Sequence, residues 1–160
     1  MNTIKCSCGC NTNSCKFNPC AVTCSPCVEA PRGYGYVYNI TRQNVDEDEA
    51  VTFSSNGLLS SGITHVAGTS DIVITTAGVY LINYYVGEEG QFTVYQNSAP
   101  VAGSTYASSE DIIYGQVIIS AQAGDIITLV NTDNDDVDLD ADGKAPENVT
   151  NASMTILRVF

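Results

Sequence analysis

The feature that most constrains the fold of this chain is the apolar and aromatic run from Val79 to Val86. β-branched and aromatic residues favour the pleated, packed surface of a strand. Asn83 is the only clear polar break in the run, so the run predicts a strand that is covered on both faces. A shorter apolar strand, Ile72 to Ile74, is predicted to precede it around a corner. One domain of 160 residues has limited means of covering both faces of a strand, so we expect a partner subunit to cover one of them.

The chain from Gly33 onward shows the same preference for strands. Turn signals recur about every 8–12 residues, and no helical periodicity is visible. The clearest period-2 pattern is the alternation of Tyr34, Tyr36 and Tyr38 with smaller residues. Further strands are expected at residues 51–53, 91–96, 101–107, 112–120 and 126–131, with turns or loops at 46–49, 54–62, 97–100 and 108–111. This pattern predicts an all-β sandwich.

Three segments, in order along the chain, resemble parts of a known superfamily. They are Ala77–Val86, Ala123–Asn131 with its Gly-Asp turn, and the closing Ala152–Phe160. They resemble the central, a late and the terminal strand of the tumour necrosis factor and complement globular-head superfamily. The bacterial spore-surface members, such as the C-terminal domains of collagen-like exosporium glycoproteins, are the branch that the chain resembles most. The resemblance covers roughly residues 33–160, and it implies a jelly roll that packs as a homotrimer and has no catalytic site.

Aromatic residues are the candidates for the core and for the trimer contacts that this resemblance implies. They are Tyr34, Tyr36, Tyr80, Tyr84 and Phe160. For the alternating tyrosines near Gly33, a platform on which a ligand stacks is the alternative interpretation.

The charge of the chain limits the classes of partner. The chain holds 18 acidic and 6 basic residues, which gives a formal net charge of −12. Such a surface repels phosphate backbones and anionic lipids, so we expect no nucleic-acid partner and no membrane partner. No stretch approaches the roughly 20 apolar residues of a membrane helix, and no export signal is visible. We therefore expect synthesis in a cytosol and no export by the general route. The resemblance to spore-surface proteins implies that this is a mother-cell cytosol, and that the protein reaches an extracellular spore surface when that cell lyses.

Residues 1–32 form a separate compositional zone, which we expect to act as a connector for the jelly-roll domain at residues 33–160. Polar and small residues dominate this zone, so it cannot build a hydrophobic core and must be ordered by crosslinks, metal or a partner. It contains all seven cysteines of the chain: Cys6, Cys8, Cys10, Cys15, Cys20, Cys24 and Cys27.

Three interpretations of these cysteines are open. In the first, which we favour, they form disulfides, and their odd number leaves at least one for another chain. In the second they bind metal, although a zinc ribbon needs two Cys-x-x-Cys pairs and only Cys24 and Cys27 form one. In the third they are passive buried thiols. A redox motif would need a βαβ context that the sequence lacks.

The length of the connector suggests a role in assembly. About 30 extended residues span roughly 100 Å, whereas a domain of this size is roughly 35–40 Å across. The connector could therefore cross a neighbouring subunit, and head-to-tail contacts that do not close produce filaments. The predicted function is a structural subunit of an extracellular filament or surface layer, such as a spore appendage or pilus. The alternative is a globular head that recognises a receptor or glycan and is anchored to a spore surface layer by its Cys-rich tail.

The most acidic segment, residues 133–143, is a candidate cation site. Asp138, Asp140 and Asp142, followed by a glycine, match the opening of a calcium loop. An EF-hand would place its bidentate glutamate at Val149, so the match fails there. A less regular Ca²⁺ site and a merely solvated loop are the two alternatives, and the predicted function requires no cofactor.

Little in the sequence supports catalysis. His65 is the only histidine, and no catalytic Ser or Cys context lies near it, so it cannot anchor a catalytic triad; we expect it to be a half-buried strand residue. No phosphate-binding glycine loop and no Gly-x-Ser-x-Gly elbow are present. We expect a protein that is not an enzyme. Asn39, Asn148 and Asn151 match the N-glycosylation pattern, and we interpret these matches as chance.

Overall fold

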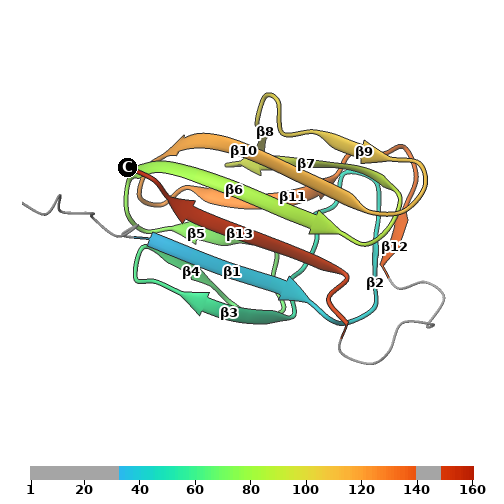
Figure 1. Cartoon of the computed structure of the whole chain (residues 1–160), viewed down its shortest axis with the longest axis horizontal. Helices are drawn as coiled ribbons and strands as arrows, with labels where there is room; N and C mark the ends of the chain where they lie inside the picture. Colours follow the sequence, from blue (N-terminus) through green and yellow to red (C-terminus); the bar gives the residue numbers. More distant parts are fainter. Residues whose placement is uncertain (1–32, 140–148) are drawn as a thin grey trace, which may run out of the picture. The chain divides into compact units, whose positions relative to one another are not determined.

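The computed structural model describes residues 33–139 and 149–160 of the chain. All regular structure in these residues is β, and every strand pair is antiparallel. Two larger sheets form the layers of a sandwich (Figure 1). The prediction of an all-β jelly-roll sandwich is confirmed.

The first layer is a five-stranded sheet in the order β10-β6-β13-β1-β3. Its strands are β1 (Gly33–Asn39), β3 (Ser55–Leu59), β6 (Gly78–Val86), β10 (Ile113–Ala121) and β13 (Ala152–Arg158). The apolar run that dominates the sequence is β6, which pairs with β10 on one side and with β13 on the other.

The second layer is a six-stranded sheet in the order β4-β5-β11-β7-β8, with β9 also paired to β7. Its strands are β4 (Ile63–His65), β5 (Ile72–Ile74), β7 (Gly90–Gln96), β8 (Ala99–Pro100), β9 (Tyr106–Ser108) and β11 (Ile126–Asn131). A small third sheet pairs β2 (Gln43–Val45) with β12 (Val137–Leu139).

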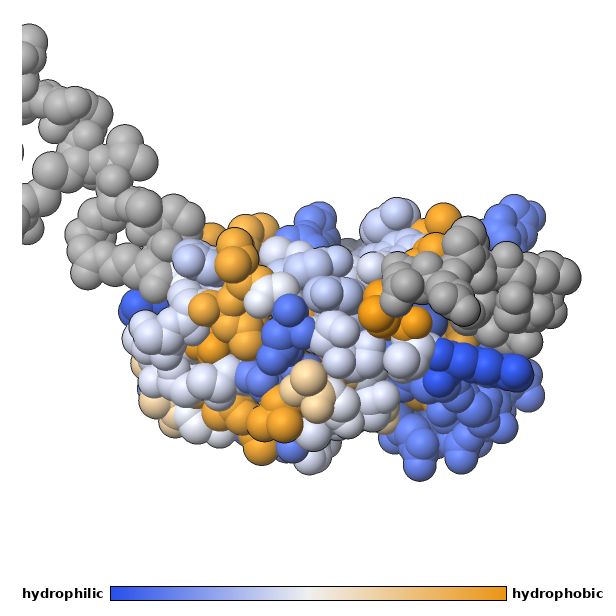
Figure 2. Space-filling view, turned by 90° about the horizontal axis from the view of Figure 1, so that it is seen from below, coloured by the Kyte–Doolittle hydropathy of each residue, from blue (hydrophilic) through white to orange (hydrophobic). Residues whose placement is uncertain are grey.

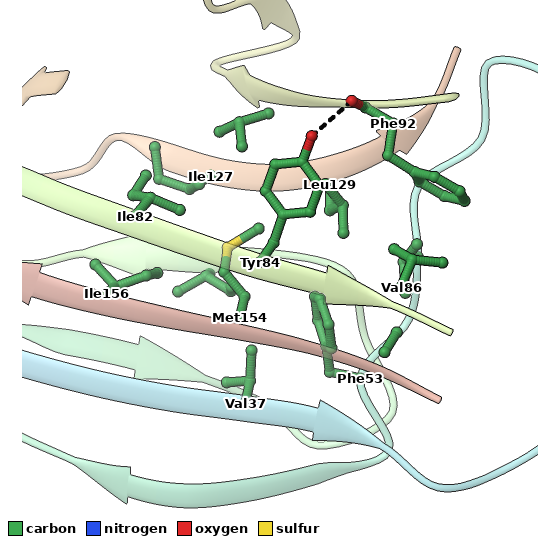
Figure 3. Close-up of a cluster of buried hydrophobic side chains, with 14 of the residues drawn as sticks. Val37, Phe53, Ile82, Tyr84, Val86, Phe92, Ile127, Leu129, Met154 and Ile156 are labelled. Atoms are coloured by element: carbon green, nitrogen blue, oxygen red, sulfur yellow. Dashed lines mark hydrogen bonds between the residues drawn. The ribbon is translucent and has the colours of Figure 1, made fainter. Parts of the chain in front are cut away.

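The core lies between the two larger sheets, because every second residue of each strand points inward. On β6 the inward residues are Tyr80, Ile82, Tyr84 and Val86, each no more than 2% exposed. They pack against side chains of the opposite sheet such as Phe92, Ile127 and Leu129 (Figure 3). Full burial of one such side chain stabilises the fold by about 1.5–3 kcal/mol.

Tyr84 ties the two sheets together through its hydroxyl group. This group donates hydrogen bonds to the carbonyl oxygens of Phe92 (2.8 Å, dashed in Figure 3) and Ser104 (2.9 Å). Burial raises the pKa of Tyr84 well above its ordinary value. The ring passes so close to β10 that a Cβ at Gly115 would lie 2.2 Å from Cζ of Tyr84. Only glycine fits there without movement of the ring.

Several predicted boundaries were wrong. Residues 54–62 were expected to be turn and loop, but Ser55–Leu59 forms β3 at the edge of the first sheet. Gly57 allows this pairing, because the ring of Tyr36 lies over it and a Cβ would be 2.6 Å from Cδ1 of that ring. Local turn chemistry was overridden here by packing against a neighbouring strand.

Other corrections concern short segments. Among residues 51–53 only Phe53 makes a β-bridge, with Thr69, although Val51 and Phe53 are fully buried. The strand expected at residues 101–107 is reduced to β9. The acidic segment after β11 is not one continuous loop, because it contains β12. In the described part of the chain, no helix is long and apolar enough to span a membrane.

Candidate interaction surfaces

The outer face of the five-stranded sheet is the first candidate. It consists of the outward side chains of β1, β13, β6 and β10, which alternate with the core residues. Strand register arranges them in rows across the sheet: Tyr34, Leu157, Leu81 and Ile118 in the first row; Tyr36, Thr155, Asn83 and Gln116 in the second; Tyr38, Ser153, Tyr85 and Tyr114 in the third.

None of these outward side chains is charged, although the chain carries 18 acidic residues. Several are large and open to solvent: Tyr114 is 69% exposed, Ile118 65% and Tyr34 44%. The rings of Tyr36 and Tyr38 stack with centroids 5.4 Å apart, and those of Tyr85 and Tyr114 lie 5.2 Å apart. An uncharged face that exposes several large aromatic and aliphatic side chains is a candidate interaction site.

The structure places the predicted core and trimer residues in three different surroundings. Tyr80 and Tyr84 lie in the core, so they are not available for contact with another subunit. Tyr34 and Tyr36 lie on the outer face. Phe160 follows the end of β13 and is 84% exposed, and its backbone oxygen accepts hydrogen bonds from the backbone N–H of Val79 (3.0 Å) and Nε of Arg158 (3.0 Å).

The second candidate is the acidic end of the domain, where β6, β11 and β12 end or begin. A hollow of about 430 Å³ is lined there by residues that include Glu88, Glu89, Asp133, Asp135, Asp136 and Asp138. Hydrophilic residues gather over this end of the domain in Figure 2, on the side of β12.

The structure leaves the calcium prediction untested. Asp138 lies in β12 and forms an ion pair with Arg42 (2.7 Å), and the hydrogen bond from Arg42 lowers the pKa of this carboxyl group. Asp140 and Asp142 lie outside the described residues. Within residues 33–139 and 149–160, no three candidate ligands are grouped so that they could hold a metal ion. Specific Ca²⁺ binding therefore stays a prediction.

Three polar residues that the sequence brought into question have hydrogen-bond partners in the structure. His65 is 8% exposed in β4, and its Nε2 donates to the carbonyl oxygen of Thr69 (3.0 Å). Nδ2 of Asn39 donates to Oδ1 of Asn151 (2.8 Å), and Nδ2 of Asn151 donates to the carbonyl oxygen of Thr41 (3.0 Å). Because both asparagines are buried, the folded domain does not present them for glycosylation.

The seven predicted crosslinking cysteines lie outside the described residues. The sequence missed the outer face as a continuous surface, because its rows combine residues from four strands that are distant in the chain. Two signals pointed to parts of it: the alternation of Tyr34, Tyr36 and Tyr38, and the run from Val79 to Val86 that was expected to be covered on both faces.

Comparison with known proteins identifies the fold. No family model matches the chain, and no curated protein matches it. Solved structures do. Murine APRIL aligns with a TM-score of 0.59 at 12% identity, over 79% of this chain and 98% of that one. The globular domain of zebrafish complement 1qA protein aligns with a TM-score of 0.57 at 13% identity, over 80% of this chain and 98% of that one. Eiger TNF from S. frugiperda aligns with a TM-score of 0.57 at 15% identity, over 82% of this chain and 94% of that one.

These similarities show a jelly roll of the tumour necrosis factor and complement globular-head type. At these identities they show the fold alone. The expected superfamily resemblance is confirmed at this level, and the spore-surface branch stays a prediction.

Proposed function

We propose that this chain is a structural subunit that forms homotrimers through the outer face of the five-stranded sheet. In this proposal residues 1–32 join one trimer to the next, and the product is an extracellular filament or surface layer on a spore, such as an appendage or pilus. Self-association is the central claim, and no enzymatic activity is part of it.

The observation that carries the proposal is an uncharged outer face, with large exposed aromatic and aliphatic side chains, on a strongly acidic chain. The chain has a net charge of −12, so two copies repel each other over most of their surface. The rows of the outer face carry no carboxylate, and they offer aromatic and aliphatic side chains from four strands. Burial of apolar surface contributes about 25 cal/mol per Å², and a standard interface covers about 800 Å² per partner.

The direction of the strands supports a head-to-tail arrangement. β1 begins at Gly33 opposite Arg158 near the end of β13, so residues 1–32 attach at the same end as the C-terminus. The acidic loops lie at the other end of β6, where Val86 pairs with Ile113 and Ala152 (Figure 1). The connector zone holds three of the six basic residues and one of the 18 acidic ones. A connector of that charge is attracted to the acidic end of a neighbouring subunit.

The cysteines and the expected place of synthesis support an assembly that is crosslinked after release. Disulfides form in oxidising surroundings, which a chain released by cell lysis encounters late. Intermolecular bonds among seven clustered cysteines would make the filament resistant to dissociation.

The alternative is a globular head that binds a receptor or glycan, anchored to a spore surface layer by its Cys-rich tail. The observation that favours it is the similarity to APRIL and to a complement globular domain. In this alternative residues 1–32 dock on a different protein.

Negative-stain electron microscopy of the full-length protein, beside a variant that lacks residues 1–31, tests the choice. We expect fibres from the full-length protein and discrete trimers from the variant. Discrete particles from both would contradict the filament and favour the anchored head. Light scattering of the full-length protein in reductant tests the trimer itself, and a monomer of 17.0 kDa at all concentrations would contradict it.

A further inference from the structure

Asn83 interrupts the apolar run of β6, and the structure places it in the middle of the outer face. It lies in the second row, between Thr155 on β13 and Gln116 on β10. The row is polar at these three positions. On one side of it lie Leu81 and its neighbours in the first row, and on the other lie the rings of Tyr85 and Tyr114. A row with three polar residues therefore lies between two rows that are mostly aliphatic and aromatic.

The carboxamides of Asn83 and Gln116 have no hydrogen-bond partner among the described residues. They are directly opposite each other on β6 and β10, a position in which Cβ atoms are about 4.5–5.5 Å apart. Asn83 and Gln116 are also among the residues that line a hollow of about 290 Å³, with Tyr84, Tyr106, Tyr114 and Gly115. By contrast, every buried side-chain polar atom in the described part of the domain has a partner.

Covering these amides with an apolar surface is unfavourable. A buried amide that loses water without gaining a partner costs about 1–3 kcal/mol. A second copy of this chain carries the same pair of amides on the same face. Each amide both donates and accepts, so amides from different copies can bond to one another. Copies could pack in several ways that bury the first and third rows. Only those in which the amides of different copies also bond to one another avoid the cost of an unpaired buried amide.

We propose that Asn83 and Gln116 set the register and the number of copies in the assembly, with a second copy of this chain as the occupant of the face. This inference rests on the proposed self-association. Two observations point to a second copy: the face has no charge on a strongly acidic chain, and its free amides complement themselves. A single buried asparagine fixes register and oligomer number in coiled coils by the same physical means.

Native mass spectrometry of the full-length chain tests the proposal, in reductant so that cysteine crosslinks do not contribute. The wild type is compared with Asn83→Leu/Gln116→Leu and with a control, Thr128→Leu, on the outer side of the other sheet. We expect one stoichiometry for the wild type and the control. The double variant is expected to associate at least as tightly but to give two or more stoichiometries, because apolar packing no longer discriminates between registers.

A single, unchanged stoichiometry in the double variant would overturn the proposal and leave the self-association of the face intact. Complete loss of association in that variant would also overturn it, because the amides would then provide the affinity between copies and would not determine the number of copies. A wild type that is monomeric throughout would overturn both the inference and the proposed function.

The isosteric variant Asn83→Asp gives a second test that preserves the shape of the side chain. Carboxylates from different copies would meet at the row, and like charges at an interface cost several kcal/mol. We expect association to weaken roughly a hundredfold at neutral pH, with recovery at high salt. Unchanged association would show that Asn83 does not meet another copy, and would overturn the proposal.

Discussion

The two faces of the five-stranded sheet come from the same strands and differ in what covers them. The inner residues of β6 are covered by the six-stranded sheet, and Tyr84 finds two carbonyl acceptors there. The outer residues one position away, such as Leu81 and Asn83, are only half-buried by their neighbours within the sheet. One face is completed within the chain, and the other is suited to being completed by a second copy.

The largest expected effect separates the two faces by charge. Leu81→Glu places a carboxylate in the middle of the outer face, where copies are proposed to meet. Buried or like charges there cost several kcal/mol, so we expect the trimer to dissociate into folded monomers. Sedimentation velocity measures this, with Thr128→Glu on the other sheet as the matched control. If the Leu81→Glu variant remained trimeric, the interface between copies would have to lie on another surface.

The next comparison uses two neighbouring residues of β6. Ile82→Ala empties space in the core and should lower the free energy of unfolding by about 2–5 kcal/mol. Leu81→Ala removes a half-buried side chain, so its cost to the isolated domain should be well below that. Urea unfolding under conditions in which both are monomeric measures the difference. Equal losses would mean that the outer face is as fully packed as the core.

Removal of one hydroxyl group from a tyrosine on each face allows the same comparison of inner and outer residues. Tyr84→Phe leaves the carbonyl oxygens of Phe92 and Ser104 without this donor and should cost about 1–3 kcal/mol. Tyr114→Phe removes a hydroxyl group from a ring that is 69% exposed, so the free energy of unfolding should hardly change. Thermal unfolding of the two variants measures both. Similar effects would contradict the role of Tyr84 in joining the sheets.

The smallest expected effect concerns an acceptor at the end of the domain opposite the acidic loops. The carboxylate of Asp125 accepts hydrogen bonds from Nδ2 of Asn97 (2.8 Å), the backbone N–H of Gln122 (2.8 Å) and Nε2 of Gln96 (2.7 Å). The bond from Asn97 is the largest cause of the lowered pKa of Asp125, followed by those from Gln122 and Gln96.

A lowered pKa in the folded state means that the ionised form stabilises the fold. This stabilisation is present above the pKa of the unfolded chain, about 3.9, and is lost as the pH falls through the lower pKa of the folded state. Asp125→Asn should therefore be slightly less stable at pH 7 and lose less stability on acidification. Urea unfolding from pH 7 to pH 2 tests this, with Glu47→Gln as a control for the removal of one negative charge. Parallel curves for Asp125→Asn and the wild type would contradict it.

Much of the fold could be predicted from local patterns. The alternation at Tyr34–Tyr38 and the runs at residues 91–96, 112–120 and 126–131 became strands because period-2 patterning survives in any sandwich. β3 could not be predicted, because Gly57 is a turn signal locally and a packing requirement under Tyr36. β12 could not be predicted either, because its three residues pair with β2, which is more than 90 positions away in the chain.

For the candidate site, the sequence identified the types of residue, and the structure showed which of them lie in the core and which lie on the surface. Tyr80, Tyr84 and Tyr36 have the same chemistry in the sequence, but Tyr80 and Tyr84 are core residues and Tyr36 belongs to the outer face. Asp138 looked like a calcium ligand by its spacing, and the structure pairs it with Arg42. Neither distinction has a local signal, because both depend on which strands become neighbours.

The sequence by itself determined that this chain folds as strands, carries a strong negative charge and concentrates its cysteines ahead of Gly33, since composition and periodicity are local properties. Only the tertiary structure decided that β5 and β6, adjacent in the sequence, belong to different sheets. It also decided that Asn83, Gln116 and three rows of outward side chains lie on one uncharged face. The physical reason is that strand pairing brings distant residues side by side, and no window along the chain contains that information.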